Sequence, residues 1–140
     1  MNYLIDTNVL CESTRPQPDI KVERWLRGLP TTCQFISVIS VAEIRKGVLM
    51  LSGGKKRRAL EAWLDEQLLP AFEGRILPLG EEEMLHWARM QAEAGLKGNP
   101  LPVVDSLIAA TAKCHALVLA TRNTADFRHC QIKIHNPWVD

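Results

Sequence analysis

The feature that most constrains how this chain folds is the alternation of short apolar runs with longer stretches of helical periodicity. Five apolar runs are typical of strands, at residues 3–5, 33–38, 75–77, 116–120 and 132–134. Stretches bounded by glycine and proline favour helices between them, at residues 19–29, 58–69 and 81–96. Because strands that alternate with helices form parallel sheets, we predict an α/β fold with a mostly parallel central sheet flanked by helices.

Length and composition favour one domain, residues 1–140, large enough to bury its own core. Hydrophobic residues make up 46% and charged residues 24% of the chain, which excludes a disordered protein. No stretch is long and apolar enough to span a bilayer, and the first residues do not resemble a signal peptide, so we expect no membrane partner and a cytoplasmic location. The four cysteines are scattered and are interpreted as small buried residues, not as a zinc or redox pair.

Four acidic residues lie at distant points where an apolar run ends or a helix begins: Asp6, Glu43, Asp105 and Asp126. Asp6 and Asp126 can cap a helix or close a turn, and Ser40 with Glu43 has the spacing of a capping box. Asp105 could also cap a helix. A functional role is favoured for it, because apolar residues follow it three, four and seven positions later and a bare carboxylate there would be costly.

Taken together, these acids are predicted to converge, because ligands of open α/β sheets bind beyond the carboxyl ends of the strands. Several carboxylates at that edge would repel one another unless a cation lay between them. Oxygen ligands without paired Cys or His favour a hard ion, so we predict Mg²⁺, with Mn²⁺ as the alternative.

Five segments, in this order, resemble the PIN-domain ribonucleases, in particular the VapC-like and FitB-like toxins of bacterial type II toxin-antitoxin pairs. The segments are IDTNVL (5–10), SVAEIRKG (40–47), DSLIAATA (105–112), TRNTADF (121–127) and NPW (136–138). The resemblance implies a PIN-like fold and a metal-dependent endoribonuclease that hydrolyses RNA phosphodiester bonds. It implies Asp6, Glu43 and Asp105 as metal ligands and catalytic residues, with Asn123 and Asp126 as supporting polar groups.

The resemblance also implies partners. A small cognate antitoxin with a DNA-binding domain, a toxin homodimer and a toxin-antitoxin hetero-oligomer are expected. One alternative is a noncatalytic PIN-fold module whose acids only cap helices and which works with a DNA-binding antitoxin on operator DNA. Another is a PIN nuclease of RNA maturation that has no antitoxin.

Two residues are predicted to contact the substrate. Lys46 follows Glu43 by three positions, so it would lie beside Glu43 on a helix and either pair with it or bind a phosphate. Thr121 ends an apolar run and is predicted to face the site. The net charge is only +1, which gives no overall basic field, and the one basic cluster, residues 55–58, is either a solvated surface or a phosphate contact.

Overall fold

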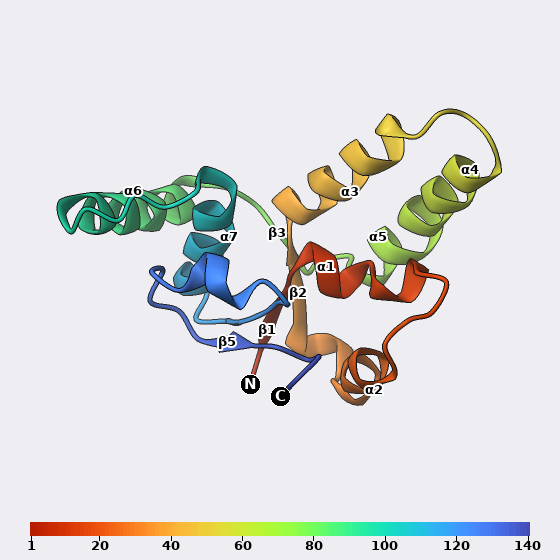
Figure 1. Cartoon of the computed structure of the whole chain (residues 1–140), viewed down its shortest axis with the longest axis horizontal. Coiled ribbons are helices and arrows are strands. Elements are labelled where there is room, and N and C mark those ends of the chain that lie inside the picture. Colours follow the sequence, from red (N-terminus) through yellow and green to blue (C-terminus); the bar gives the residue numbers. More distant parts are fainter.

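The computed structural model describes all residues, 1–140, and contains a five-stranded parallel sheet (Figure 1). Its strand order is β3-β2-β1-β4-β5, and every neighbouring pair is parallel. The strands are β1 (Tyr3–Ile5), β2 (Gln34–Ser37), β3 (Ile76–Leu77), β4 (Val118–Ala120) and β5 (Ile134–His135). The predicted α/β fold with a parallel sheet is therefore confirmed, although most strands are shorter than predicted.

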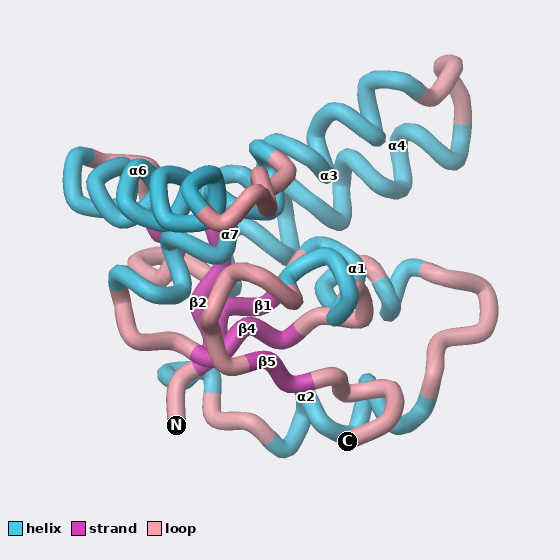
Figure 2. The backbone as a smooth tube through the Cα atoms, turned by 60° about the vertical axis from the view of Figure 1, so that its left-hand side comes forward, coloured by secondary structure: helices cyan, strands magenta, loops and turns pink.

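The α-helices connect and cover the strands. They are α1 (Thr7–Leu10), α2 (Ile20–Gly28), α3 (Val38–Met50), α4 (Lys55–Ala62), α5 (Leu69–Ala71), α6 (Glu81–Leu96) and α7 (Val103–Cys114). Figure 2 shows the sheet between α6 and α7 on one side and α2 on the other. None of the helices combines the length and the apolar character that a membrane span requires.

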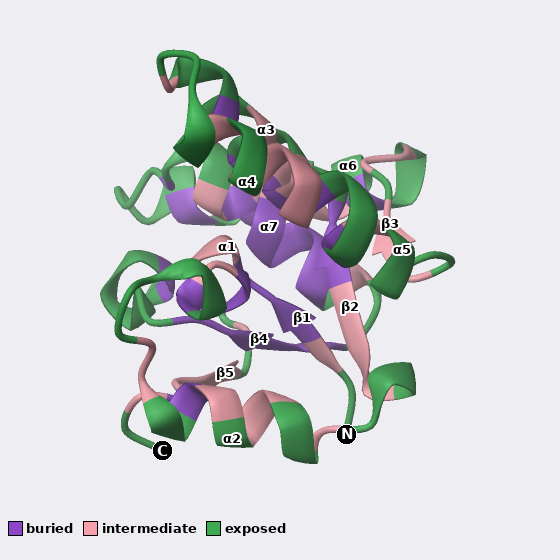
Figure 3. Cartoon of the chain, turned by 90° about the vertical axis from the view of Figure 1, so that its right-hand side faces the viewer, coloured by how far each residue is buried: buried purple, intermediate pink, exposed green.

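Side chains that alternate along the strands build two separate cores. On β1, Leu4 packs into a core with residues of α6 and α7, whereas Ile5 packs into a second core with residues of α1, α2 and α3. Successive side chains of a strand point to opposite faces of the sheet, which explains the division. Figure 3 shows that β1, β4 and the inner side of α7 are the most buried segments.

Two local predictions are corrected. The capping box of Ser40 with Glu43 is absent, because α3 begins at Val38 and its cap is Ser37, whose hydroxyl accepts a hydrogen bond from the Ile39 backbone N–H at 3.0 Å. The helix predicted at 58–69 begins earlier and continues past its expected end at Pro70, through a π-helical turn at Trp63–Leu68 and on to Ala71.

Candidate active site

The site is built at the centre of the sheet, where β1 and β4 lie side by side. Asp6 follows β1 directly and Thr121 follows β4 directly. The chain leaves β1 for β2 on one side and returns to β4 on the other, so the order of the strands reverses between them. The carboxyl ends of the strands at such a reversal form the usual binding crevice of an open α/β sheet.

Asp6 is held by hydrogen bonds on both oxygens of its carboxylate. Its Oδ1 accepts from the Thr7 backbone N–H at 2.8 Å, which makes Asp6 the cap of α1, and its Oδ2 accepts from the Thr121 hydroxyl at 2.8 Å. Asp6 is buried, and burial raises the pKa of its carboxyl despite these hydrogen bonds. The negative charges of Glu43 and Asp126 raise this pKa further.

Thr121 supports Asp6 and does not reach the surface. Its side chain is 0% exposed, and its hydroxyl also accepts hydrogen bonds from the Asn8 side-chain amide at 3.3 Å and from the Asn123 backbone N–H at 3.1 Å. A fully buried hydroxyl with three partners gives Thr121 a structural role, and its predicted substrate contact stays a prediction. The hydroxyl fixes the position of the Asp6 carboxylate.

A polar cavity of about 230 Å³ opens in front of Asp6. It is lined by Asp6, Thr7, Asn8, Cys11, Glu43, Asp105, Ile108 and Asn123. The three predicted metal ligands thus reach one cavity from three elements: the end of β1, the helix α3 and the first turn of α7. No Lys, Arg or His lines the cavity to neutralise them.

Glu43 is exposed on α3 and accepts a hydrogen bond from the Thr7 hydroxyl at 2.9 Å. This contact, between residues 36 positions apart in the chain, takes the place of the predicted pair with Lys46. Lys46 is exposed and forms no ion pair, whereas the neighbouring Arg45 pairs with Asp65 on the following helical segment. Lys46 is thus a free cation one helical turn from the cavity.

Asp105 is half-buried in the first turn of α7, and its carboxylate has no hydrogen-bond partner. Burial raises the pKa of this carboxyl, and the charges of Asp126 and Asp6 raise it further. Asp126 lies on an exposed 3₁₀ turn, Thr124–Phe127, so it acts on the site through its field and does not line the cavity. Of the two supporting groups that were predicted, Asn123 is the one in the cavity wall.

Besides the apolar Ile108, three further residues of the cavity were missed by sequence reasoning. Thr7 and Asn8 follow Asp6 directly, and their position just after a buried strand is the signal that could have identified them. Cys11 lies one turn further along, where no sequence pattern indicates it. Burial, with the charge of Glu43, raises the pKa of the Cys11 thiol to about 11, so this thiol stays protonated at neutral pH.

The donor set of this cavity fits a hard divalent cation. All candidate ligands are oxygen atoms, and their mutual repulsion calls for a positive charge between them. The three carboxylates line one cavity, and their oxygens do not all lie within 4.8 Å of one another. A hard divalent cation can be bound directly by one or two carboxylates and keep several waters.

Comparison with known proteins agrees with this arrangement. The PIN domain profile matches residues 3–132. The chain is 42% identical to Toxin FitB of Neisseria gonorrhoeae over 137 residues, which are 98% of this chain and 99% of that protein. It is 35% identical to the VapC ribonuclease Y4jK of Sinorhizobium fredii over 135 residues, 96% of each protein.

Solved structures are similar over almost the whole chain. A chain of the FitAcB crystal structure from Neisseria gonorrhoeae superimposes with a TM-score of 0.93 at 41% identity, covering 99% of both chains. A chain of FitAB bound to an IR36 DNA fragment gives a TM-score of 0.91 at 40% identity, covering 97% of this chain and 95% of that one. With the profile matched across most of its length, and with fold and relatives in agreement, the chain belongs to the PIN domain family.

Proposed function

We propose that this protein is the endoribonuclease toxin of a type II toxin-antitoxin pair and that it hydrolyses RNA phosphodiester bonds at the carboxylate cavity. The observation that carries the proposal is the convergence of Asp6, Glu43 and Asp105 on one cavity without a cationic neighbour. The relatives support it, because two of them are a toxin and a VapC ribonuclease.

The residues of the cavity have separate roles in this proposal. Asp6, Glu43 and Asp105 hold a divalent cation, for which PIN ribonucleases have a general requirement, and we propose Mg²⁺, with Mn²⁺ as a substitute. When bound, such an ion lowers the pKa of a coordinated water and offsets the charge that develops on the phosphoryl oxygens.

The other groups around the site position these ligands or meet the substrate. The Thr7 hydroxyl holds the Glu43 carboxylate, and the Thr121 hydroxyl holds Asp6. Asn123 lies in the cavity wall with its side-chain amide available to a phosphate oxygen, and Lys46 offers a positive charge beside Glu43. Asp126 adds to the negative field that draws the cation to Asp105. Asp6, Glu43, Asp105, Asn123 and Asp126 are therefore the proposed catalytic residues.

The partners follow from the same relatives. The FitAB chain that resembles this protein was solved with a DNA fragment, which supports a cognate antitoxin that carries the DNA-binding domain. We also propose a homodimer of this chain within a toxin-antitoxin hetero-oligomer. The cytoplasmic location stays a prediction.

One observation favours the noncatalytic alternative. Asp6 caps α1 and Glu43 is held by Thr7, so two of the three acids have structural partners that need no cation. A PIN-fold module that works only with its antitoxin on operator DNA would keep such contacts.

The deciding experiment incubates antitoxin-free protein with total cellular RNA in Mg²⁺, in Mn²⁺ and in chelator, and maps the fragment ends. Asp105→Asn removes one charge from the cavity, and Glu66→Gln removes one charge from an exposed position as the matched control. We expect discrete metal-dependent cuts by the wild type and by Glu66→Gln, and none by Asp105→Asn. Intact RNA with all three folded proteins would favour the noncatalytic module.

A further inference from the structure

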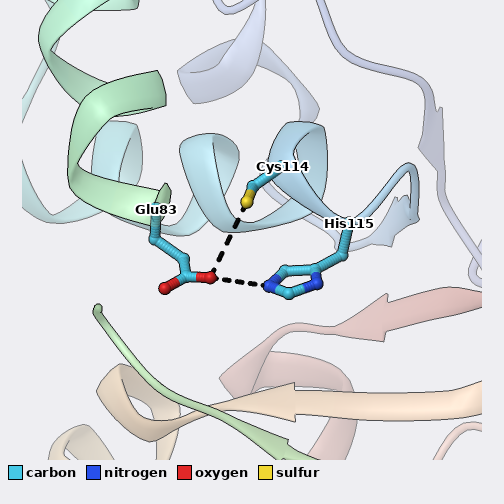
Figure 4. A group of neighbouring side chains, drawn as sticks. All are labelled: Glu83, Cys114 and His115. Atoms are coloured by element: carbon cyan, nitrogen blue, oxygen red, sulfur yellow. Dashed lines mark hydrogen bonds and ion pairs between the residues drawn. The ribbon is translucent and has the colours of Figure 1, made fainter. Parts of the chain in front are cut away.

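A second group of metal-ligating side chains lies at the other end of α7 from Asp105. Glu83 belongs to the first turn of α6, Cys114 is the last residue of α7, and His115 follows it (Figure 4). One ligand atom from each lies within 4.8 Å of the other two, and no other group of three Asp, Glu, His or Cys residues is packed so closely. The helical rise places Asp105 and Cys114 about 13 Å apart along α7, so the two sites are separate.

The ligand atoms already face one point. Glu83 Oε1 accepts from the Gly80 backbone N–H at 2.7 Å, which fixes the carboxylate. Its Oε2 lies 2.8 Å from His115 Nε2 and 3.7 Å from Cys114 Sγ, and Figure 4 shows both side chains directed at this oxygen. Glu83 is 5% exposed, whereas the His115 side chain is 32% exposed and gives access from solvent.

We propose that Glu83, Cys114 and His115 form a binding site for a thiophilic divalent cation of the Zn²⁺ type. A sulfur and an imidazole nitrogen select Zn²⁺ over Mg²⁺, which prefers an all-oxygen set such as that of the carboxylate cavity. Three protein ligands with a fourth position open to water is a common zinc arrangement.

The distances are close to those of a tetrahedral site. Zn–S, Zn–N and Zn–O bonds of about 2.0–2.3 Å separate the ligand atoms by about 3.4–3.5 Å. The distance from Sγ to Oε2 needs little change, and the distance from Nε2 to Oε2 has to open by about half an ångström. His115 is the residue that can make this movement, because it lies beyond the end of α7 with its ring partly in solvent.

Cation binding exchanges hydrogen bonds for metal bonds. Without a cation, the thiol and the imidazole N–H both point at Glu83 Oε2. On binding, the thiol proton passes to solvent as the Sγ–metal bond forms, and the imidazole carries its proton on Nδ1 so that the Nε2 lone pair binds the metal. The bound cation would join the start of α6 to the end of α7 and stabilise the folded protein by mass action.

The experiment uses Co²⁺ as a spectroscopic probe for Zn²⁺. Reduced, metal-free protein in excess Mg²⁺ is titrated with Co²⁺, and the thiolate-to-cobalt charge-transfer band and the visible bands of tetrahedral Co²⁺ are recorded. Cys11 is the thiol that lines the carboxylate cavity, so Cys11→Ser is the matched control for Cys114→Ser. We expect the bands to survive in Cys11→Ser, to disappear in Cys114→Ser and to be displaced by one equivalent of Zn²⁺.

Two further variants keep the test independent of any folding defect in Cys114→Ser. His115→Ala and Glu83→Gln each remove one ligand, and each should weaken Co²⁺ binding by about tenfold or more. Circular dichroism of every variant checks its fold. Bands that persist in Cys114→Ser and vanish in Cys11→Ser would place the cation in the carboxylate cavity and overturn the proposal. No band with the wild type would leave Glu83, Cys114 and His115 as a hydrogen-bonded helix cap only.

Discussion

At the scale of single residues, Asp6 combines two roles that sequence reasoning treated as alternatives. One oxygen of its carboxylate caps α1, and the other is held by Thr121. Both oxygens keep lone pairs that can face the cavity, because a carboxylate accepts about four hydrogen bonds in all. Capping therefore orients the Asp6 carboxylate and is compatible with its proposed role as a metal ligand.

The first prediction concerns Thr121. Thr121→Val keeps the shape of the side chain but removes the donor to Asp6 and the acceptor for Asn8 and Asn123. We expect a loss of about 2 kcal/mol in the free energy of unfolding, because buried polar groups are left without partners, and a weaker affinity for Mg²⁺. Urea unfolding and calorimetric Mg²⁺ titration measure both. Thr121→Ser retains the hydroxyl and should preserve both properties. If Thr121→Ser lost as much stability and Mg²⁺ affinity as Thr121→Val, the effect would come from packing and not from the hydrogen bonds.

The second prediction concerns the repulsion in the cavity. Asp105→Asn removes a negative charge that the charges of Asp6 and Asp126 repel. In the presence of a chelator, which removes divalent cations, the variant should therefore be more stable than the wild type. The gain should be about 0.5 kcal/mol, because the carboxylate is partly exposed and its interactions are screened. Glu66→Gln, at an exposed position outside the cavity, should leave the stability unchanged.

Saturation with Mg²⁺ should reverse this order. The wild type gains about 2.7 kcal/mol when Mg²⁺ is present at one hundred times its dissociation constant, and the variant loses most of that gain. Thermal melts with and without Mg²⁺ measure both effects. An Asp105→Asn protein less stable than the wild type in chelator would show that Asp105 has a structural role.

The sequence could predict that Asp6 and Asp105 converge, because their positions follow from the topology. Asp6 and Asp105 each lie at the end of a strand or the start of a helix, so the parallel sheet brings them to one cavity. The direction of Thr121 could not be predicted in the same way, because a shift of one residue turns a side chain to the other face of a sheet. The Thr7 contact that replaced the Glu43 pair with Lys46 depends on tertiary packing and has no local signal.

At the scale of elements, α6 and α7 form the unit that presents Asp105. The buried Ser106 hydroxyl accepts from Trp87 Nε1 at 2.9 Å and from Gln91 Nε2 at 3.0 Å, and it donates to the Val103 carbonyl at 2.8 Å. This hydroxyl therefore links α6 to the first turn of α7, one residue after the site acid.

The third prediction tests that link. Ser106→Ala should lower the free energy of unfolding by about 2 kcal/mol. The reason is that the Gln91 side-chain amide and the Trp87 indole N–H both lose the hydroxyl that accepts their hydrogen bonds. Thr111→Val is the control: Thr111 is equally buried on α7, but its hydroxyl donates only to Leu107 of the same helix. Urea unfolding followed by tryptophan fluorescence measures both. Equal losses in the two variants would show that the contact between the helices adds nothing.

The limits of sequence reasoning at this scale have local causes. The helix start at Val38 was placed too late because both Ser37 and Ser40 can cap, and the choice depends on where β2 ends. The helical run passes Pro70 because this proline enters the first turn of a new helical segment after the π-helical turn, where a missing N–H costs little. The group of Glu83, Cys114 and His115 escaped a search for paired motifs because its ligands come from two helices.

At the scale of the whole molecule, the proposed function requires the acidic cavity to accept a polyanion although the net charge is only +1. The basic cluster of residues 55–58 lies in the first turn of α4, beside the tip where α3 and α4 project from the molecule (Figure 1), and Arg57 in it pairs with Glu61. Lys46 is nearer to the site, because it lies one helical turn after Glu43 on α3. Its ammonium group also forms no ion pair within the protein. We therefore expect the phosphate contact closest to the cavity at Lys46.

The last prediction measures this contact by its dependence on salt. Each phosphate contact with single-stranded RNA changes the slope of a plot of the logarithm of the association constant against the logarithm of the salt concentration by about 0.7. In an Asp105→Asn background, which we expect to prevent cleavage, Lys46→Ala should reduce the magnitude of that slope by about 0.7 and weaken binding similarly for different RNA sequences. Fluorescence anisotropy with labelled single-stranded RNA at several salt concentrations gives the slope.

Arg45→Ala is the matched control for Lys46, because it removes a positive charge from the adjacent position of α3. Its guanidinium is already paired with Asp65, so its loss should leave the slope almost unchanged. If both variants reduced the slope equally, RNA would respond to the general charge of α3 and Lys46 would have no specific role. If neither did, the phosphates would be held elsewhere, and the exposed cations of residues 55–58 would be the next group to replace.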